Sequence, residues 1–266
     1  MQIALTIAGS DSGGGAGIQA DLKTFHRFGV FGTSVIAAIT AQNTLGVAGW
    51  SAVPTEMIRA QLDAVATDLR PAAVKTGMLA DAEVVATVAR GLRDYALAPY
   101  VLDPVMVATS GDVLLQPSAV SAIRRELVPL AELVTPNLDE AAILLGEPVA
   151  DVESMRRAAR ALVERGGARA ALVKGGHLPG RETVDVLFDG DLHEFRHARI
   201  ETRSTHGTGC TLSAAVTAQL AAGRPLHDAV RCALDYVHEA IRTAPGLGAG
   251  HGPLNHFAGA ATPPGE

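Results

Sequence analysis

The chain has 266 residues, 48% of them hydrophobic and 19% charged, which is enough apolar material for the large core of a globular protein. A formal net charge of −6, without runs of lysine or arginine, argues against a nucleic-acid partner or a membrane surface. Since no apolar stretch could span a membrane, no signal-peptide pattern occurs and Cys210 and Cys232 are the only cysteines, we expect a cytoplasmic protein without a disulfide framework.

The first half of the chain alternates short apolar runs with helical patterns of hydrophobicity. Buried strands are expected over 3–8, 34–40, 73–75 and 100–102, with a weaker strand over 47–53. Helices are expected over 18–28, 55–69 and 81–93. Gly29 is the stop signal of the first helix, and the side chains of Thr55 and Asp81 are suited to cap the other two.

The second half continues the alternation and adds a hairpin. Helices are expected over 117–127, 138–145, 151–165, 210–223 and 226–242, and strands over 132–134 and 170–173. Two alternating segments, 183–188 and 192–195, flank the turn Asp189-Gly190-Asp191 and predict a β-hairpin. Because no composition break, linker or repeat divides the chain, we expect one domain over 1–258 and a flexible tail over 259–266.

Short apolar strands that alternate with helices indicate an α/β fold with a parallel sheet covered on both faces. In such sheets, ligands bind beyond the carboxyl ends of the strands. The residues that follow successive apolar runs here are Asp11, Gln42, Met78, Asp103, Asn137 and Lys174. Polar turn residues are normal at strand ends, but the residues capable of chemistry gather at one end only, and this favours a binding site there.

A glycine-rich turn, Gly207-Thr208-Gly209, leads into a small-residue pattern typical of a buried helix beginning at Cys210. The amides of Thr208 and Gly209 are expected to be unpaired at the helix start, where the helix dipole adds positive charge and an anion such as phosphate can bind. The same field favours the thiolate of Cys210, which would then be able to act as a base. The alternative is an ordinary turn before a core helix, with Cys210 as a small buried hydrophobe.

The absence of other motifs narrows the chemistry. The sequence contains no P-loop pattern, no dinucleotide-binding glycine spacing, because Ile18 stands where the third glycine is required, and no nucleophile elbow. An anion-binding helix start, a lysine and scattered acids remain. These are the groups that phosphoryl transfer needs: donors for the phosphates, an acid to hold Mg²⁺ and a base near the acceptor hydroxyl.

Seven motifs in order are similar to those of a known family. They are AGSDSGGGAGIQADLK (8–23), AQNT (41–44), KTGML (75–79), LDPVM (102–106), TPNLDEA (135–141), VKGGH (173–177) and THGTGC (205–210). From near residue 3 to about residue 257, the chain resembles the hydroxymethylpyrimidine/phosphomethylpyrimidine kinases of thiamine biosynthesis, which belong to the ribokinase-like superfamily. The resemblance implies a ribokinase-like three-layer α/β/α sandwich with a mostly parallel central sheet.

The resemblance also implies the reaction. Phosphate would pass from ATP to the hydroxymethyl group of 4-amino-5-hydroxymethyl-2-methylpyrimidine, and then to the resulting monophosphate. Cys210 would be the catalytic base, and Gly207, Thr208 and Gly209 would form the anion hole for the moving phosphoryl group.

The remaining roles are carried over position by position. On the pyrimidine side the resemblance implies Gln42 at the ring edge, Asp21 near the hydroxymethyl group or its phosphate, and Gly9, Met78 and Val105 around the ring. On the nucleotide side it implies Lys174 and Asn137 at the ATP phosphates, with Thr205 and His206 nearby. Asp103 and Glu140 would hold Mg²⁺ directly or through water.

Two rival functions remain open, and the resemblance also suggests a homodimer. The first rival is a pyridoxal kinase of the same family; such kinases carry a further cysteine after the Asp-Pro motif, and the matching segment here, 105–112, has none. The other cysteine, Cys232, is assigned to helix packing. The second rival, of a different class, is a non-catalytic sensor that binds the pyrimidine without turnover.

Overall fold

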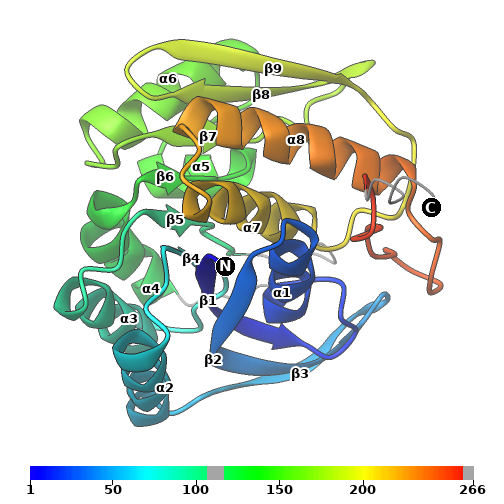
Figure 1. Cartoon of the computed structure of the whole chain (residues 1–266). Helices are drawn as coiled ribbons and strands as arrows, with labels where there is room; N and C mark the ends of the chain where they lie inside the picture. Colours follow the sequence, from blue (N-terminus) through cyan, green and yellow to red (C-terminus); the bar gives the residue numbers. More distant parts are fainter. Residues whose placement is uncertain (107–116, 260–266) are drawn as a thin grey trace.

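The computed structural model describes residues 1–106 and 117–259, and its centre is a nine-stranded sheet with the order β3-β2-β1-β4-β5-β6-β7-β8-β9 (Figure 1). The strands are β1 (Ile3–Asp11), β2 (Phe31–Asn43), β3 (Gly46–Ala52), β4 (Ala73–Thr76), β5 (Tyr100–Leu102), β6 (Leu133–Val134), β7 (Ala171–Val173), β8 (Glu182–Phe188) and β9 (Leu192–Ala198). Strands β2, β1, β4, β5, β6 and β7 run parallel, whereas β3, β8 and β9 are antiparallel additions at the two edges.

Helices cover both faces of the sheet (Figure 1). One face carries α2 (Thr55–Asp68), α3 (Ala82–Asp94), α4 (Pro117–Ala122) with the π-helical turn Ile123–Leu127 and the 3-10 turn Val128–Leu130, α5 (Leu138–Leu145) and α6 (Val152–Glu164). The other face carries α1 (Gly17–Arg27), α7 (Thr208–Ala221) and α8 (Leu226–Arg242). The predicted three-layer α/β/α arrangement with a mostly parallel sheet is therefore present.

The local signals in the sequence were mostly read correctly. Asp81 caps α3 by accepting a hydrogen bond of 2.9 Å from the amide of Val84. Asn137 and Glu140 form a capping box at the start of α5, which was not among the sequence-based expectations. The hairpin of β8 and β9 is also present. The expected cap at Thr55 is wrong, because α2 begins there and its N-cap is Pro54, which has no side-chain donor or acceptor.

The order of the strands creates the crevice. The chain runs from β1 outward to β2 and β3, and then returns to place β4 on the other side of β1. The loops after β1 and β4 therefore diverge, and open α/β sheets bind ligands at such a switch point. In the part of the chain that the structure describes, no helix is long and apolar enough to cross a membrane. The predicted tail lies outside the described residues, except for residue 259.

Candidate active site

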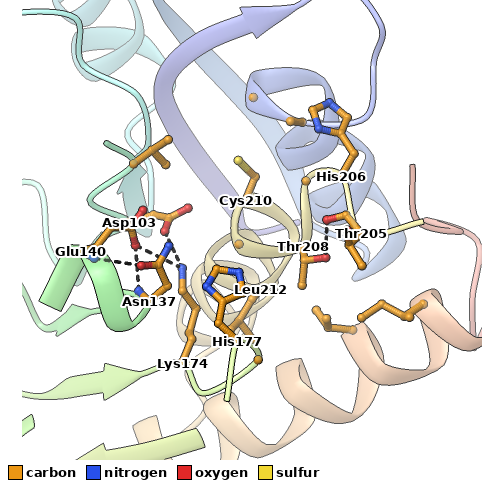
Figure 2. A pocket seen from close by; sticks show the side chains of 18 of the residues that line it. Asp103, Asn137, Glu140, Lys174, His177, Thr205, His206, Thr208, Cys210 and Leu212 are labelled. Carbon is orange, nitrogen blue, oxygen red and sulfur yellow. Dashed lines mark hydrogen bonds and ion pairs between the residues drawn. The ribbon is translucent and has the colours of Figure 1, made fainter. Parts of the chain in front are cut away.

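A cavity of about 600 Å³ opens at the carboxyl ends of the parallel strands. Every residue that was assigned to the site from the sequence lines this cavity, with the single exception of Asp21. Figure 2 shows Asp103, Asn137, Glu140 and Lys174 gathered on one side of Cys210, and Thr205, His206 and Thr208 on the other. The cavity therefore brings together side chains that lie as far apart in the sequence as Gly9 and Cys210.

The start of α7 has a backbone conformation that only glycine adopts without strain. Gly207 is the N-cap with a φ of +80°, and a Cβ atom there would lie 1.8 Å from the carbonyl oxygen of Gly15. The amide of Thr208, which was expected to be unpaired, donates to the carbonyl oxygen of Thr205 at 3.2 Å. Within the described chain, the amides of Gly209 and Cys210 have no partner. The anion-binding donors are therefore one residue further along the helix than the sequence suggested.

The thiol of Cys210 lies at this helix start, half-buried at the floor of the cavity. Burial raises the pKa of Cys210 to about 12, and the charges of Asp21 and Asp103 add to the rise, whereas Lys75 and the amide of Gly17 oppose it. The effect of burial therefore exceeds that of the nearby positive charge, and the thiol is protonated at neutral pH. The role of Cys210 as a base stays a prediction.

Asp21 does not face the cavity. Its side chain is completely buried, where it accepts hydrogen bonds from Lys75 Nζ at 2.8 Å and Thr6 Oγ1 at 2.6 Å. The charge of Asp21 nevertheless acts on Cys210, because it adds to the rise in the pKa of the thiol. The sequence offered a signal for this pair, since a lysine inside the buried run 73–75 requires a buried counter-charge.

The polar cluster on the opposite wall is built on α5 and on the ends of β5 and β7. Lys174 Nζ lies 3.1 Å from Asp103 Oδ1 and 3.9 Å from Glu140 Oε2. Asn137 holds Glu140 in place. The backbone amide of Asn137 donates to Glu140 Oε2 at 2.8 Å, and Asn137 Oδ1 accepts from the backbone amide of Glu140 at 2.9 Å. Ser213 Oγ on α7 donates to Asp103 Oδ2 at 3.2 Å, which ties this cluster to the helix of Cys210.

The electrostatics of this cluster suit a phosphate-bearing ligand. Burial and the neighbouring charge of Asp103 raise the pKa of Glu140 to about 7, although Lys174 opposes the rise. Burial lowers the pKa of Lys174, but the two carboxylates outweigh it and the net shift is upward, so the lysine stays charged. A charged lysine, beside a glutamate whose pKa is raised to about 7 and the amides of Gly209 and Cys210 that lack a partner in the described chain, is an arrangement that can hold phosphate groups.

A magnesium ion fits this wall together with a nucleotide. Within the described ranges, no group of three or more histidine, cysteine, aspartate or glutamate side chains could hold a metal ion alone. Mg²⁺ at nucleotide sites is usually held through one or two carboxylates, with waters and phosphate oxygens as the other ligands. Asp103 and Glu140 supply two such carboxylates.

The far end of the cavity, toward β2, has a small apolar wall. Met78 packs with Ala38 and with the partly buried Val105, and a Cβ atom on Gly9 would lie 3.2 Å from the Met78 sulfur. Glycine at position 9 therefore leaves the wall flat enough for a planar ring. Gln42, half-buried at the end of β2, supplies a donor and an acceptor beside this wall.

Asp11 was found at a strand end but was not assigned to the site, and the structure gives it a central position. Its carboxylate accepts hydrogen bonds from the amides of Gly13 (2.8 Å), Gly15 (3.0 Å) and Ala16 (2.8 Å) and from His206 Nε2 (2.9 Å). Burial raises the pKa of Asp11, but these hydrogen bonds outweigh it and the net shift is downward. His206, expected beside the nucleotide, thus lies beside Asp11, with its Nε2 atom 3.5 Å from Gln42 Nε2.

The side of the cavity next to α8 is more apolar than the sequence indicated. Thr205 lines this side of the cavity (Figure 2), and its place beside a nucleotide stays a prediction. The remaining wall comes from α7, α8 and the segment after β9, namely Leu212, Leu234, Val237, His238, Ile241 and Ile200. This wall could not be predicted from the sequence, because apolar residues on an amphipathic helix predict core packing and carry no signal for a ligand.

Comparison with known proteins agrees with this geometry. A family model described as phosphomethylpyrimidine kinase matches residues 11–255. A hydroxymethylpyrimidine/phosphomethylpyrimidine kinase of Rhizobium meliloti is 58% identical over 96% of this chain and 97% of its own length. An ADP complex of Bacillus subtilis pyridoxal kinase superposes with a TM-score of 0.90 at 38% identity, covering 97% of this chain and 98% of that one. A phosphomethylpyrimidine kinase of Clostridium difficile superposes with a TM-score of 0.81 at 41% identity, covering 91% of this chain and 100% of that one. The predicted ribokinase-like fold is confirmed, and the chain belongs to the phosphomethylpyrimidine kinase family.

Proposed function

We propose that this cavity transfers the terminal phosphate of ATP to the hydroxymethyl oxygen of 4-amino-5-hydroxymethyl-2-methylpyrimidine and then to the resulting monophosphate, in thiamine diphosphate biosynthesis. One observation carries the proposal. At Gly209 a Cβ atom would lie 3.1 Å from Lys174 Nζ and 3.7 Å from Asp103 Oδ2. The unpaired amides of α7 thus share one small space with a lysine and a carboxylate, and Cys210 follows directly. The relatives named above support the substrate.

The acceptor hydroxyl would attack the terminal phosphorus while its proton passes to Cys210 Sγ. The bond from phosphorus to the bridging oxygen breaks and ADP leaves. Only the thiolate form of Cys210 can accept this proton; because burial raises the pKa of the thiol to about 12, that form is strongly basic but rare at neutral pH. The amides of Gly209 and Cys210 would stabilise the charge on the moving phosphoryl group.

The other side chains of the cavity bind and orient. Lys174 and Asn137 would contact the phosphates of ATP, and Thr205 would lie beside the nucleotide. Asp103 and Glu140 would hold Mg²⁺, which when bound neutralises charge on the phosphates. On the pyrimidine side, Gln42 would bind the ring edge, and Gly9, Met78 and Val105 would enclose the ring. ATP as the donor is supported by the ADP complex of the B. subtilis enzyme.

A pyridoxal kinase is the second candidate, and one observation favours it. The high structural similarity to a protein named pyridoxal kinase supports pyridoxal as the alternative acceptor alcohol. The lack of cysteine in segment 105–112 favours the pyrimidine, but residues 107–112 lie outside the described part of the chain. The homodimer stays a prediction.

An assay coupled to ADP release tests the proposal. The purified chain with Mg²⁺ and ATP is given the pyrimidine alcohol, its monophosphate or pyridoxal, and initial rates are compared. We expect kcat/KM for both pyrimidines to exceed that for pyridoxal. Faster turnover of pyridoxal would establish the second candidate, and binding of the pyrimidine without any ADP release would establish the sensor.

A further inference from the structure

Three polar side chains meet at the pyrimidine end of the cavity, and their protons can be assigned from their partners. His206 Nε2 lies 2.9 Å from Asp11 Oδ2 and 3.5 Å from Gln42 Nε2. Asp11 and His206 are nearly inaccessible to solvent, with side-chain exposures of 3% and 9%. All three line the cavity, so the arrangement faces the ligand while water has little access to it.

The proton on His206 is fixed by Asp11. An ionised carboxylate can only accept hydrogen bonds, and Asp11 Oδ2 already accepts from the amides of Gly15 and Ala16. His206 Nε2 must therefore carry a proton and donate it. If the NH₂ group of Gln42 faced that nitrogen, two donors would oppose each other. An oxygen atom at the same place would instead be attracted by the polar N–H group that His206 donates to Asp11.

The hydroxyl proton of Thr40, which lies on the side of the Gln42 amide away from His206, indicates the same orientation of that amide. Thr40 Oγ1 lies 2.9 Å from the carbonyl oxygen of Ser10 and 3.1 Å from Gln42 Oε1. A hydroxyl has one proton, and the carbonyl can only accept, so the proton goes to Ser10. Thr40 Oγ1 is then left with lone pairs, which suit an NH₂ group and repel an oxygen. Amide oxygen and nitrogen have nearly the same shape, so their positions follow from such partners.

We propose that His206, held by Asp11, acts with Thr40 to fix the side-chain amide of Gln42 with its oxygen toward His206 and its NH₂ group toward Thr40, and thereby selects the 4-aminopyrimidine ring. The inference rests on the proposed function, in which Gln42 binds the ring edge. His206 is a positioning residue in this scheme, because it acts through Gln42.

A fixed amide reads the ring because it presents its acceptor and its donor in one order. The 4-aminopyrimidine edge offers an exocyclic NH₂ donor and a ring-nitrogen acceptor. The 4-oxo analogue, 5-hydroxymethyl-2-methylpyrimidin-4(3H)-one, has the same shape but offers an acceptor and a ring N–H donor in the reverse order. It would have to turn over in the cavity, which moves its hydroxymethyl group away from Cys210. If the amide could rotate, both rings would bind in the productive orientation.

The test compares the two alcohols with His206→Phe, which keeps a ring beside Gly15 but removes the donor. The readout is the ratio of kcat/KM for the amino ring to that for the oxo ring, with the corresponding ratio of Kd measured by calorimetry without nucleotide. We expect the ratio to fall by about tenfold, since roughly one neutral hydrogen bond enforces the orientation. His206→Gln, which restores a donor, should recover part of the ratio, and a merely structural loosening would weaken both rings equally.

Matched variants keep the proposal falsifiable. Thr40→Val is isosteric and tests the contribution of Thr40 to the orientation of the Gln42 amide. This variant carries the test if His206→Phe fails to fold. In a Gln42→Ala background the ratio of kcat/KM for the amino ring to that for the oxo ring should be low, and adding His206→Phe should not lower it further. An unchanged ratio in both His206→Phe and Thr40→Val, with a collapsed ratio in Gln42→Ala, would overturn the inference. If the unaltered chain phosphorylates neither ring, the proposed function itself fails, which is a distinct result.

Discussion

The pH dependence of folding should report on one buried histidine near the C-terminus. His256 is 7% exposed, and its Nε2 atom lies 3.2 Å from Thr211 Oγ1 on the first turn of α7. Its carbonyl oxygen accepts a hydrogen bond of 3.1 Å from Tyr236 on α8. Burial lowers the pKa of His256 from 6.5 to about 4, and the positive charge of Lys23 adds to the shift.

The sign and the size of the effect follow from this shift. Between pH 4 and 6.5 the unfolded chain binds a proton at this position that the folded chain does not. Stability is therefore complete above the unfolded pKa and falls as the pH drops toward the folded pKa. A shift from 6.5 to about 4 corresponds to about 3 kcal/mol in total, of which about 2 kcal/mol should be lost at pH 5.

Urea unfolding of the unaltered chain and of His256→Gln, at several pH values from 5 to 7.5, measures this effect. Glutamine can keep the hydrogen bond to Thr211 but does not titrate, so the stability difference between the two proteins should shrink by about 2 kcal/mol as the pH falls to 5. His26→Gln, at an exposed position on α1, is the control: it measures how replacing an accessible histidine changes the stability at each pH. A difference between the unaltered chain and His256→Gln that does not vary with pH would refute the reasoning.

The other predictions concern the site and its support. Cys210→Ala should lower kcat by about a hundredfold or more, while calorimetry should give nearly the same Kd for the pyrimidine, because a base acts mainly in the transition state. Near-normal turnover of this variant would mean that another group takes the proton. Gln42→Ala should raise the Kd for the pyrimidine by about tenfold, since it removes one or two hydrogen bonds, and an unchanged Kd would exclude the assigned contact. Lys75→Met should destabilise the chain by about 3 to 5 kcal/mol in urea unfolding, because it leaves the buried carboxylate of Asp21 without the ammonium group that pairs with it. The double variant with Asp21→Asn should recover part of this lost stability. Gly207→Ala should impair turnover and lower the melting temperature, since its Cβ atom would collide with the chain at 1.8 Å, and normal values of both would show that the turn is free to move.

Much of the fold followed from the sequence because local rules and tertiary packing agree in it. Asp81 caps a helix as its position suggested, and the Asp189-Gly190-Asp191 turn joins two antiparallel strands. The C-terminal end of β2 could not be predicted, because Gln42 and Asn43 are polar and gain their strand conformation from pairing with β3. The cap at Thr55 failed because α2 begins one residue earlier than a threonine cap would place it.

The site could be predicted as a set of residues but not as an arrangement. Strand ends and glycine turns mark positions near a ligand, and almost all the residues chosen on that basis line the cavity. Which charges face each other depends on side-chain burial, which a sequence pattern does not report. Asp21 was for this reason assigned to the ligand although it pairs with Lys75 inside the protein. His206 was placed with the nucleotide although it contacts Asp11.

The anion-binding turn also explains why the arrangement depends on the whole chain. Gly207 is the N-cap of α7 but supplies no side-chain hydrogen bond, so the turn needs tertiary support. The N-terminal glycine-rich loop supplies it through Gly15, whose carbonyl oxygen lies against Gly207, and through the contact of Asp11 with His206.

The C-terminal segment supports the same turn from the other side. The amide of His206 donates to the carbonyl oxygen of Gly252 at 3.1 Å, and His256 reaches Thr211 one turn into α7. The donors of Gly209 and Cys210 are thus aimed by residues from both ends of the chain. A substitution in either end segment that breaks these contacts should impair phosphoryl transfer without touching a ligand, because preorganised donors stabilise charge only while their direction is fixed.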